Sequence, residues 1–319
     1  MKKQYLIPVV LMLVLGAYIF LKDDNQTHYT LPTPPGVDTA QIDTLTLKGP
    51  ELDLTFNKNK DQWTVGTENF PADGAAVKEM LNTLADLQIT ALASEKGDLR
   101  RYELDPDQAI EVTAMEGNAS LIRIKVGKPS VSGNHTFVML EGDKRIFHAA
   151  RNFRSQFQRD LDQFRNKHIF SLKPDQVTQF TVEIHGVDRT FMAQPHKASD
   201  KKADQPQKPG LSFVAQDGDS VDQQALSDLM SSLSDLTCQG FPQAPAREEL
   251  EKSAPICKIS LENGQTLVLN LFDQMEKALG TASTTPYTFE LASYTAQDIR
   301  SYAEKLTRTE PERKDSDKE

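Results

Sequence analysis

Two stretches decide the fold: DGAAVKEMLNTLADL at residues 73–87 and DQQALSDLMSSLSDL at residues 222–236. Their apolar residues recur at helical spacing, so each stretch predicts an amphipathic helix with one buried face. Asp73 and Asp222 stand where a helix N-cap is expected, because a carboxylate there accepts hydrogen bonds from exposed backbone N–H groups. The matched positions are Asp73, Val77, Met80, Leu81, Leu84, Asp86 and Leu87 against Asp222, Leu226, Leu229, Met230, Leu233, Asp235 and Leu236. This ungapped match predicts an internal repeat.

Short runs of alternating apolar and polar residues flank both predicted helices and indicate half-buried antiparallel strands. Before the helices, the runs are 42–47 and 52–56 in the first half and 180–184 and 190–192 in the second. After the helices, they are 110–114, 121–126 and 135–138 against 256–261, 267–272 and 287–290. Turns at 116–118 and 262–264 join the matching pairs. The sequence therefore predicts an α+β fold class, built as a tandem repeat of two antiparallel-sheet-plus-helix units.

The repeat sets the predicted domain boundaries. The first unit covers residues 39–167 and closes with a helix over 152–164, which carries Phe153, Phe157, Leu161 and Phe164 on one face. The second unit covers 168–306 and closes with a helix over 295–306. Within it, residues 195–210 are rich in Lys, Asp, Gln and Pro and predict a disordered insertion. Residues 307–319 predict a disordered charged tail.

The N-terminus predicts a membrane anchor over residues 1–24. Lys2 and Lys3 precede an apolar and aromatic run at 5–21, which spans about 26 Å at about 1.5 Å per residue, close to the thickness of a bilayer core. No A-x-A pattern ends the run, so a retained anchor is favoured over the alternative, a cleaved signal peptide. Basic residues before the run predict a cytoplasmic N-terminus, a single pass through the inner membrane and a periplasmic body. Residues 25–38 predict a tether.

Composition narrows the class of partner. The formal net charge is −10, and no stripe of Lys and Arg interleaved with aromatic residues is present, so nucleic-acid binding is not expected. The acidity also disfavours adhesion of the body to anionic lipid, which leaves the N-terminal segment as the means of attachment.

The two cysteines, Cys238 and Cys257, allow two interpretations. In an oxidising periplasm they could form a disulfide that closes a loop of about 20 residues and adds about 3 kcal/mol of stability. Alternatively, they are buried thiols that behave as small apolar residues. The sequence does not separate the two.

The chain resembles a bacterial family known as domain of unknown function 4340. The matching features are Trp63-Thr64-Val65, Pro71-Ala72-Asp73 with Val77 and Leu81, Tyr102-Glu103-Leu104-Asp105-Pro106, Ile124-Lys125-Val126-Gly127, and Phe164-Arg165-Asn166-Lys167 with Phe170 and Val177. The family usually has a glycine where this chain has Glu103, so the chain departs from the pattern at that turn. The resemblance implies a membrane-anchored envelope protein, associated in some relatives with ABC-type transport and gliding-motility components. It implies no catalytic residues.

No motif predicts catalysis, a cofactor or a metal. The six histidines do not have metal-ligand spacing, although His135 and His148 are placed to approach each other across a predicted hairpin. Residues 130–133 lack a nucleophile motif, and Gly127-Lys128 lacks a phosphate-binding loop. Trp63 and Tyr102 are candidates for stacking on a sugar ring, with core packing the alternative for Trp63.

These observations predict a noncatalytic interaction or scaffold module. The expected partner is an envelope protein or an ABC-type complex, bound through exposed strand edges or a groove between the repeats. The alternative is a periplasmic module that binds a glycan or small ligand in the cleft between the repeats. A third class, an envelope hydrolase, would require polar groups from separate strands to converge.

Overall fold

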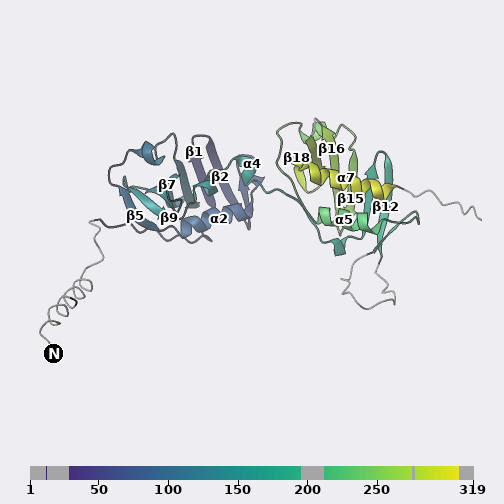
Figure 1. Cartoon of the computed structure of the whole chain (residues 1–319), viewed down its shortest axis with the longest axis horizontal. Coiled ribbons are helices and arrows are strands. Elements are labelled where there is room, and N and C mark those ends of the chain that lie inside the picture. Colours follow the sequence, from purple (N-terminus) through teal and green to yellow (C-terminus); the bar gives the residue numbers. More distant parts are fainter. Residues whose placement is uncertain (1–11, 13–28, 195–211, 275–276, 309–319) are drawn as a thin grey trace, which may run out of the picture. The chain divides into compact units, whose positions relative to one another are not determined.

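The computed structural model describes residues 12, 29–194, 212–274 and 277–308 (Figure 1). Antiparallel sheets with few helices dominate, which confirms the predicted α+β class. The predicted disordered insertion, most of the charged tail and all but one residue of the predicted anchor lie outside the described residues. Within the described part, no helix has both the length and the apolar character needed to cross a membrane.

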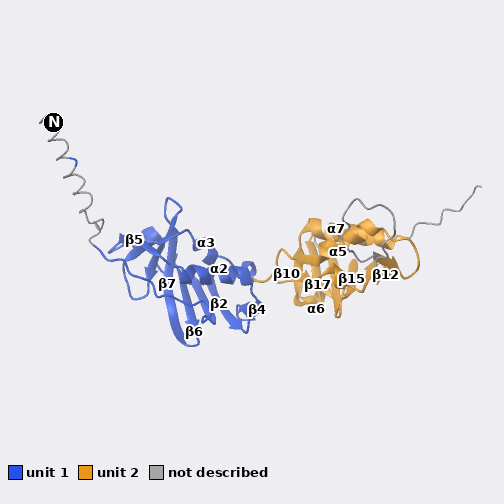
Figure 2. Cartoon of the chain, turned by 90° about the horizontal axis from the view of Figure 1, so that it is seen from below, with its two compact units in different colours: residues 1–164 blue, residues 165–319 orange. Residues whose placement is uncertain are grey.

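The chain divides into two compact units, residues 1–164 and 165–319 (Figure 2). The boundary lies three residues before the predicted one. Phe164 packs edge-on against Phe56 of the first unit, with ring centroids 5.0 Å apart. The next residue, Arg165, lies over the ring of Phe241 in the second unit, 3.7 Å from its centroid.

The first unit is a nine-stranded antiparallel sheet with helix α2 (Gly74–Ala85) along one face (Figure 1). The strands follow the order β4-β3-β2-β1-β6-β7-β8-β9-β5. Their bounds are β1 Thr44–Gly49, β2 Leu52–Asn59, β3 Gln62–Val65, β4 Phe70–Pro71, β5 Ile89–Ser94, β6 Ile110–Glu116, β7 Ala119–Pro129, β8 His135–Leu140 and β9 Ile146–Ala150. The short helix η2 (Leu99–Tyr102) lies in the connection between β5 and β6.

The second unit has a seven-stranded antiparallel sheet in the order β13-β12-β11-β15-β16-β17-β18 and a two-stranded sheet, β10-β14. The strands are β10 His168–Ser171, β11 Gln179–Ile184, β12 Val187–Gln194, β13 Ser212–Ala215, β14 Asp235–Thr237, β15 Cys257–Glu262, β16 Thr266–Gln274, β17 Lys277–Ala282 and β18 Thr285–Leu291. The helices are η3 Pro174–Gln176, α5 Gln223–Ser234, α6 Arg247–Leu250 and α7 Ser293–Thr307.

The two long inner helices begin in the same way. The Asp73 carboxylate accepts hydrogen bonds from the N–H groups of Ala75 and Ala76, at 2.9 and 3.2 Å. Asp222 does the same for Gln224 and Ala225, at 3.1 and 3.0 Å. Both predicted N-caps are therefore confirmed. The apolar positions shared by the two stretches, from Val77 to Leu87 and from Leu226 to Leu236, are all buried.

Seven strands of the two large sheets have matching positions. Counted from the side of β3 and β13, the order β3-β2-β1-β6-β7-β8-β9 corresponds to β13-β12-β11-β15-β16-β17-β18. One predicted pairing is wrong: residues 135–138 lie in β8, whose counterpart is β17, whereas residues 287–290 lie in β18, one strand further out. The sequence pattern missed β17 because KALGTA has few large apolar residues to alternate.

The predicted closing helix of the first unit is also corrected. Residues 152–164 form two short helices, α3 (Arg154–Phe157) and α4 (Leu161–Phe164). Asp160 starts the second one, because its carboxylate accepts from the N–H of Gln163 at 2.8 Å while Gln163 Oε1 accepts from the N–H of Asp160 at 3.0 Å. Phe153, Phe157 and Phe164 are nevertheless buried, as predicted. The closing helix of the second unit, α7, agrees with its predicted range of 295–306.

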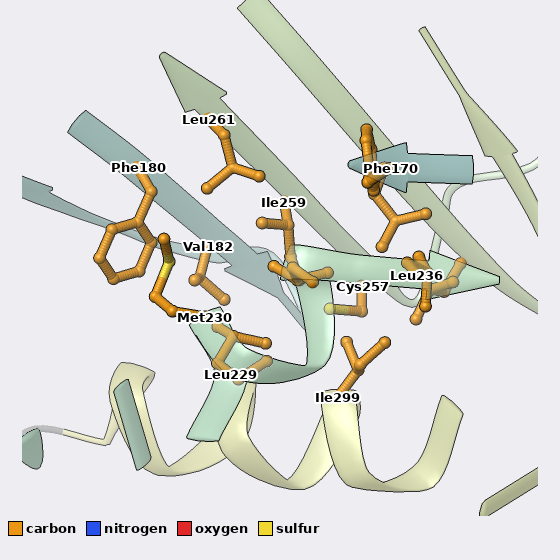
Figure 3. Close-up of a cluster of buried hydrophobic side chains, with 14 of the residues drawn as sticks. Phe170, Phe180, Val182, Leu229, Met230, Leu236, Cys257, Ile259, Leu261 and Ile299 are labelled. Carbon is orange, nitrogen blue, oxygen red and sulfur yellow. The ribbon is translucent and has the colours of Figure 1, made fainter. Parts of the chain in front are cut away.

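The core of the second unit lies between the large sheet and helices α5 and α7 (Figure 3). Phe180 of β11 stacks on Phe191 of β12, with ring centroids 4.5 Å apart. Ile259 of β15, Leu229 of α5 and Ile299 of α7 are fully buried in the same cluster. Burying a Leu or Ile side chain stabilises a fold by about 1.5–3 kcal/mol. This cluster therefore fixes both helices on the sheet.

Candidate functional site

A loop at residues 95–108 connects β5 to β6 and packs against β7 and β8 of the first sheet. Helix η2 within it begins at Asp98, whose carboxylate accepts from the N–H of Arg100 at 3.2 Å. Glu103 ends this helix with φ of +54°, a left-handed conformation that favours glycine. The tight turn expected at a glycine is therefore present in this chain with Glu103 in its place.

Tyr102, the last residue of η2 in this loop, packs against a cluster of rings on the sheet. Its ring meets Phe137 of β8 at a centroid distance of 4.7 Å, and Phe137 meets His148 of β9 at 4.6 Å. His148 meets His135 at 5.6 Å, which confirms that the two histidines approach each other across the hairpin. Burial, and secondarily His135, lower the pKa of His148, so the ring is neutral at pH 7. We call Tyr102, His135, Phe137 and His148 the ring cluster.

Arg154 of α3 fastens this loop to the sheet. Its guanidinium donates to the carbonyl oxygens of Gln108, at 2.8 Å, and Val126, at 3.4 Å. It also lies 3.6 Å from the Glu103 carboxylate. Burial lowers the pKa of Arg154 and Glu103 opposes that shift, yet the group stays charged at neutral pH. No sequence pattern predicted this contact, because Arg154 has the pattern of a surface residue of a short helix.

Trp63 does not lie near Tyr102. It is half-buried in β3, where its carbonyl oxygen accepts from the N–H of Ala72 at 2.9 Å. Five strand spacings separate β3 from β8, which carries Phe137 of the ring cluster, or about 24 Å at about 4.8 Å per spacing. The two aromatic candidates therefore cannot grip one sugar ring together. Stacking by either one alone stays a prediction.

The cysteines lie in the core of the second unit. Cys238 and Cys257 are 6% and 0% exposed, and the structure holds them as thiols. Burial raises the pKa of Cys257 to about 12, although the charge of nearby Arg300 opposes this shift. Figure 3 shows Cys257 among apolar side chains of the sheet and helices. The disulfide stays a prediction, with buried thiols as the arrangement that the structure describes.

A cavity of about 500 Å³ lies in the second unit, between α7, the strands β16 and β17, and Ile256, the residue before β15. Its floor is apolar and includes Leu271, Ala278 and Ala296. Arg300 of α7 and Asp273 of β16 line its polar side, with Arg300 Nη1 donating to Asp273 Oδ2 at 3.3 Å. Ligand pockets usually measure about 300–1,000 Å³. The cavity therefore has the size and the mixed lining of a small-ligand site.

No group of three or more His, Cys, Asp or Glu side chains that could hold a metal ion occurs within the described residues.

Comparison with known proteins gives one match. The model of a family described as Domain of unknown function (DUF4340) matches residues 63–255, from β3 to just before β15. The match therefore crosses the boundary between the two units. No curated protein and no solved structure matches the chain.

Proposed function

We propose that this chain, which belongs to the Domain of unknown function (DUF4340) family, is a noncatalytic interaction module that binds an extended segment of a partner envelope protein. The proposal includes a single-pass anchor at residues 1–24 in the inner membrane and a periplasmic body. It also holds that the two units arose by duplication of one unit, which the matching strand orders and N-caps support. The proposed partner is a component of an ABC-type membrane complex.

The binding site of this proposal is the outer edge of β13. In the first unit, β4 pairs with the outer edge of β3, the counterpart of β13. In the second unit, β13 is the last strand on that side among the described residues. The carbonyl oxygens of Phe213 and Ala215 on this edge accept from Gln223 Nε2 at 3.0 Å and from the N–H of Gly218 at 3.1 Å, but no described strand pairs with it. A strand edge without a neighbouring strand can offer main-chain groups to another strand. The partner strand would take the position that β4 has in the first unit, and this observation carries the proposal.

The other sheet edges are less suited to strand addition. Strand β5 contains two register shifts against β9, and such bulges disfavour further pairing. Strand β4 has two residues and ends in Pro71, which has no N–H to donate. Glu290 of β18 already exchanges hydrogen bonds with 239–240, at 2.8 and 2.9 Å. By contrast, β13 pairs with β12 in an unbroken register.

Exposed apolar side chains next to this edge support the same site. Val214 of β13 and Met192 of β12 are direct cross-strand partners, exposed by 37% and 40%. An added strand with an apolar residue beside Val214 would extend this pair. The partner segment is therefore expected to be extended, with apolar residues at alternate positions.

The test is crosslinking of the full chain in cells, with a photoreactive residue at position 216 beside β13. The double variant Met192→Lys and Val214→Lys places charges at the edge, which disfavours strand addition. Val131→Lys is the matched control, since Val131 is a fully exposed apolar residue of the first unit. A defined membrane complex should form with the wild type and the control and be lost in the double variant. Equal recovery from all three would refute the proposal.

The anchor has a separate test. A chain that lacks the residues before position 39, directed to the periplasm by a cleavable signal, should fold but lose the membrane complex. If the complex persists at the same level, the anchor is not needed for partner binding.

A second candidate function, small-ligand binding, is supported by the cavity beneath α7 and is developed below.

A further inference from the structure

The cavity beneath α7 contains an arginine with few protein partners. The Arg300 side chain is only 33% exposed, and among the described residues its guanidinium donates one side-chain hydrogen bond, to Asp273. A guanidinium has five N–H donors. Most of these donors therefore have no acceptor among the described residues, in a position that is two-thirds buried. A carboxylate is the natural partner for such a group, because the two can form paired hydrogen bonds.

Two carboxylates flank this arginine at the cavity. Asp273 is exposed by 55% and Glu304, one helical turn after Arg300, by 40%. Glu304 lies 4.0 Å from Nε2 of His185 and 3.9 Å from the guanidinium of Arg308, and both of these side chains are exposed. Both acids can therefore accept from an incoming ammonium group. A simple anion would meet repulsion from both, and a simple cation would meet Arg300.

The apolar floor of the cavity sets a third requirement for a ligand, in addition to a carboxylate and an ammonium group. Leu271 and Ala296 are buried and Ala278 is half-buried. The Arg300 charge also reaches the buried thiol of Cys257, where it opposes the rise in pKa. Arg300 lines the same cavity as this apolar floor. A ligand that contacts both needs an apolar group close to its carboxylate.

We propose that this cavity binds a zwitterionic ligand with apolar side chains, of the size of a dipeptide with free termini. Its carboxylate binds Arg300, its ammonium group binds Asp273 or Glu304, and its side chains cover Leu271, Ala278 and Ala296. This site is separate from the β13 edge and does not depend on it.

The test is calorimetric titration of the full chain in lipid nanodiscs with L-leucyl-L-leucine. Two blocked derivatives separate the charges: N-acetylation removes the ammonium group, and C-terminal amidation removes the carboxylate. Each should bind at least 10-fold more weakly than the free dipeptide. Binding of all three with the same affinity, or no binding of the free dipeptide, would overturn the proposal. So would preferential binding of the amidated form, which is a simple cation.

Variants assign the binding to this cavity. Arg300→Gln should weaken binding at least 10-fold, and Ala278→Phe should block it by filling the floor while leaving the charges in place. Arg308→Gln is the matched control, because Arg308 is another arginine of the C-terminal segment near Glu304 but is 79% exposed. Unchanged affinity in both Arg300→Gln and Ala278→Phe would place the binding elsewhere and refute the site.

The two proposals can fail independently. Met192→Lys with Val214→Lys should lose the membrane complex and keep dipeptide binding. Arg300→Gln should lose dipeptide binding and keep the membrane complex. If the edge variant also lost dipeptide binding while its melting temperature was unchanged, the cavity would not be an independent site.

Discussion

Substitution of Gly127 by alanine tests whether the loop at 95–108 is held tightly against the first sheet. A Cβ atom at Gly127 would lie 2.3 Å from the carbonyl oxygen of Tyr102 and 2.8 Å from Cγ of Leu104. Ordinary contacts of this kind begin near 3.4 Å. The loop must therefore retreat by about 1 Å, against the hydrogen bonds that Arg154 makes to Gln108 and Val126. Overpacking of this kind costs about 1–3 kcal/mol.

The assay is urea unfolding followed by tryptophan fluorescence. Trp63 is the single tryptophan and lies in the first unit, so its signal reports on that unit. With a denaturant slope of about 2 kcal/mol per molar urea, Gly127→Ala should lower the midpoint by about 0.5–1.5 M. Gly74→Ala is the control, because no atom lies within 4 Å of the added Cβ and alanine favours the helix. A midpoint for Gly127→Ala equal to or above that of the wild type would refute the close packing.

Three further predictions concern the caps and the second unit. Asp73→Ala and Asp222→Ala should each lower the stability of their own unit by about 1 kcal/mol in urea unfolding followed by far-UV circular dichroism, which reports on both units, and a loss in neither would contradict the cap geometry. Cys257 should resist alkylation at pH 8 in the folded protein. The folded state keeps the thiol proton up to a pKa of about 12 and the unfolded state releases it near 9.0, so this contribution is complete below pH 9. It is lost as pH rises towards 12, by up to about 1.4 kcal/mol per pH unit, which urea midpoints from pH 8 to 10 would measure. Arg189→Met should lower the stability of the second unit by about 3 kcal/mol, because it leaves carbonyl oxygens and a carboxylate without their buried donor. In the same assay, Arg308→Met, at an exposed arginine, should lower stability by less than about 0.5 kcal/mol.

The parts of the fold that the sequence predicted are those that local patterns determine. Each inner helix has an N-cap aspartate and apolar residues at helical spacing, so a single stretch contains the whole signal. The hairpin of β15 and β16 likewise has alternating residues on both sides of a turn at 262–264. In both cases, every residue of the pattern lies close along the chain to the residues that it pairs with or packs beside.

The errors have two causes, one local capping pair that was overlooked and contacts between distant segments. The predicted helix over 152–164 ignored the capping pair of Asp160 and Gln163, which starts a second short helix. Strand β5 was not predicted, because its register shifts and half-exposed residues leave no regular alternation. It is a strand because β9 lies beside it.

The residues of the candidate sites were harder still to predict from sequence patterns. Arg300 lies on a helix with acids and serines, a pattern typical of a solvated face. Its partial burial depends on β16 and on the cavity floor, which come from other parts of the chain. Arg154 likewise donates to the backbone carbonyl oxygens of Gln108 and Val126. Every residue has such an oxygen, so a sequence pattern cannot predict this contact. Only the approach of His135 to His148 could be predicted, because both lie in one hairpin.

The sheet edges of the two units differ, and this difference indicates where a partner strand would bind. After the inner helix, each chain segment returns to the last strand of its sheet: β5 pairs with β9, and 239–240 bond to Glu290 of β18. That side is therefore occupied in both units. On the other side, the first unit adds β4, which ends at Pro71, two residues before the cap of α2. Pro71 cannot donate to a further strand.

No described strand performs the role of β4 beside β13. A partner strand should therefore select the second unit, even though the strand order of the two units is otherwise the same. Placing the photoreactive residue at position 72, beside β4, gives the corresponding test in the first unit. Crosslinks to the same partner segment from both positions would contradict this selectivity, since Pro71 leaves the first edge without the N–H that an added strand needs.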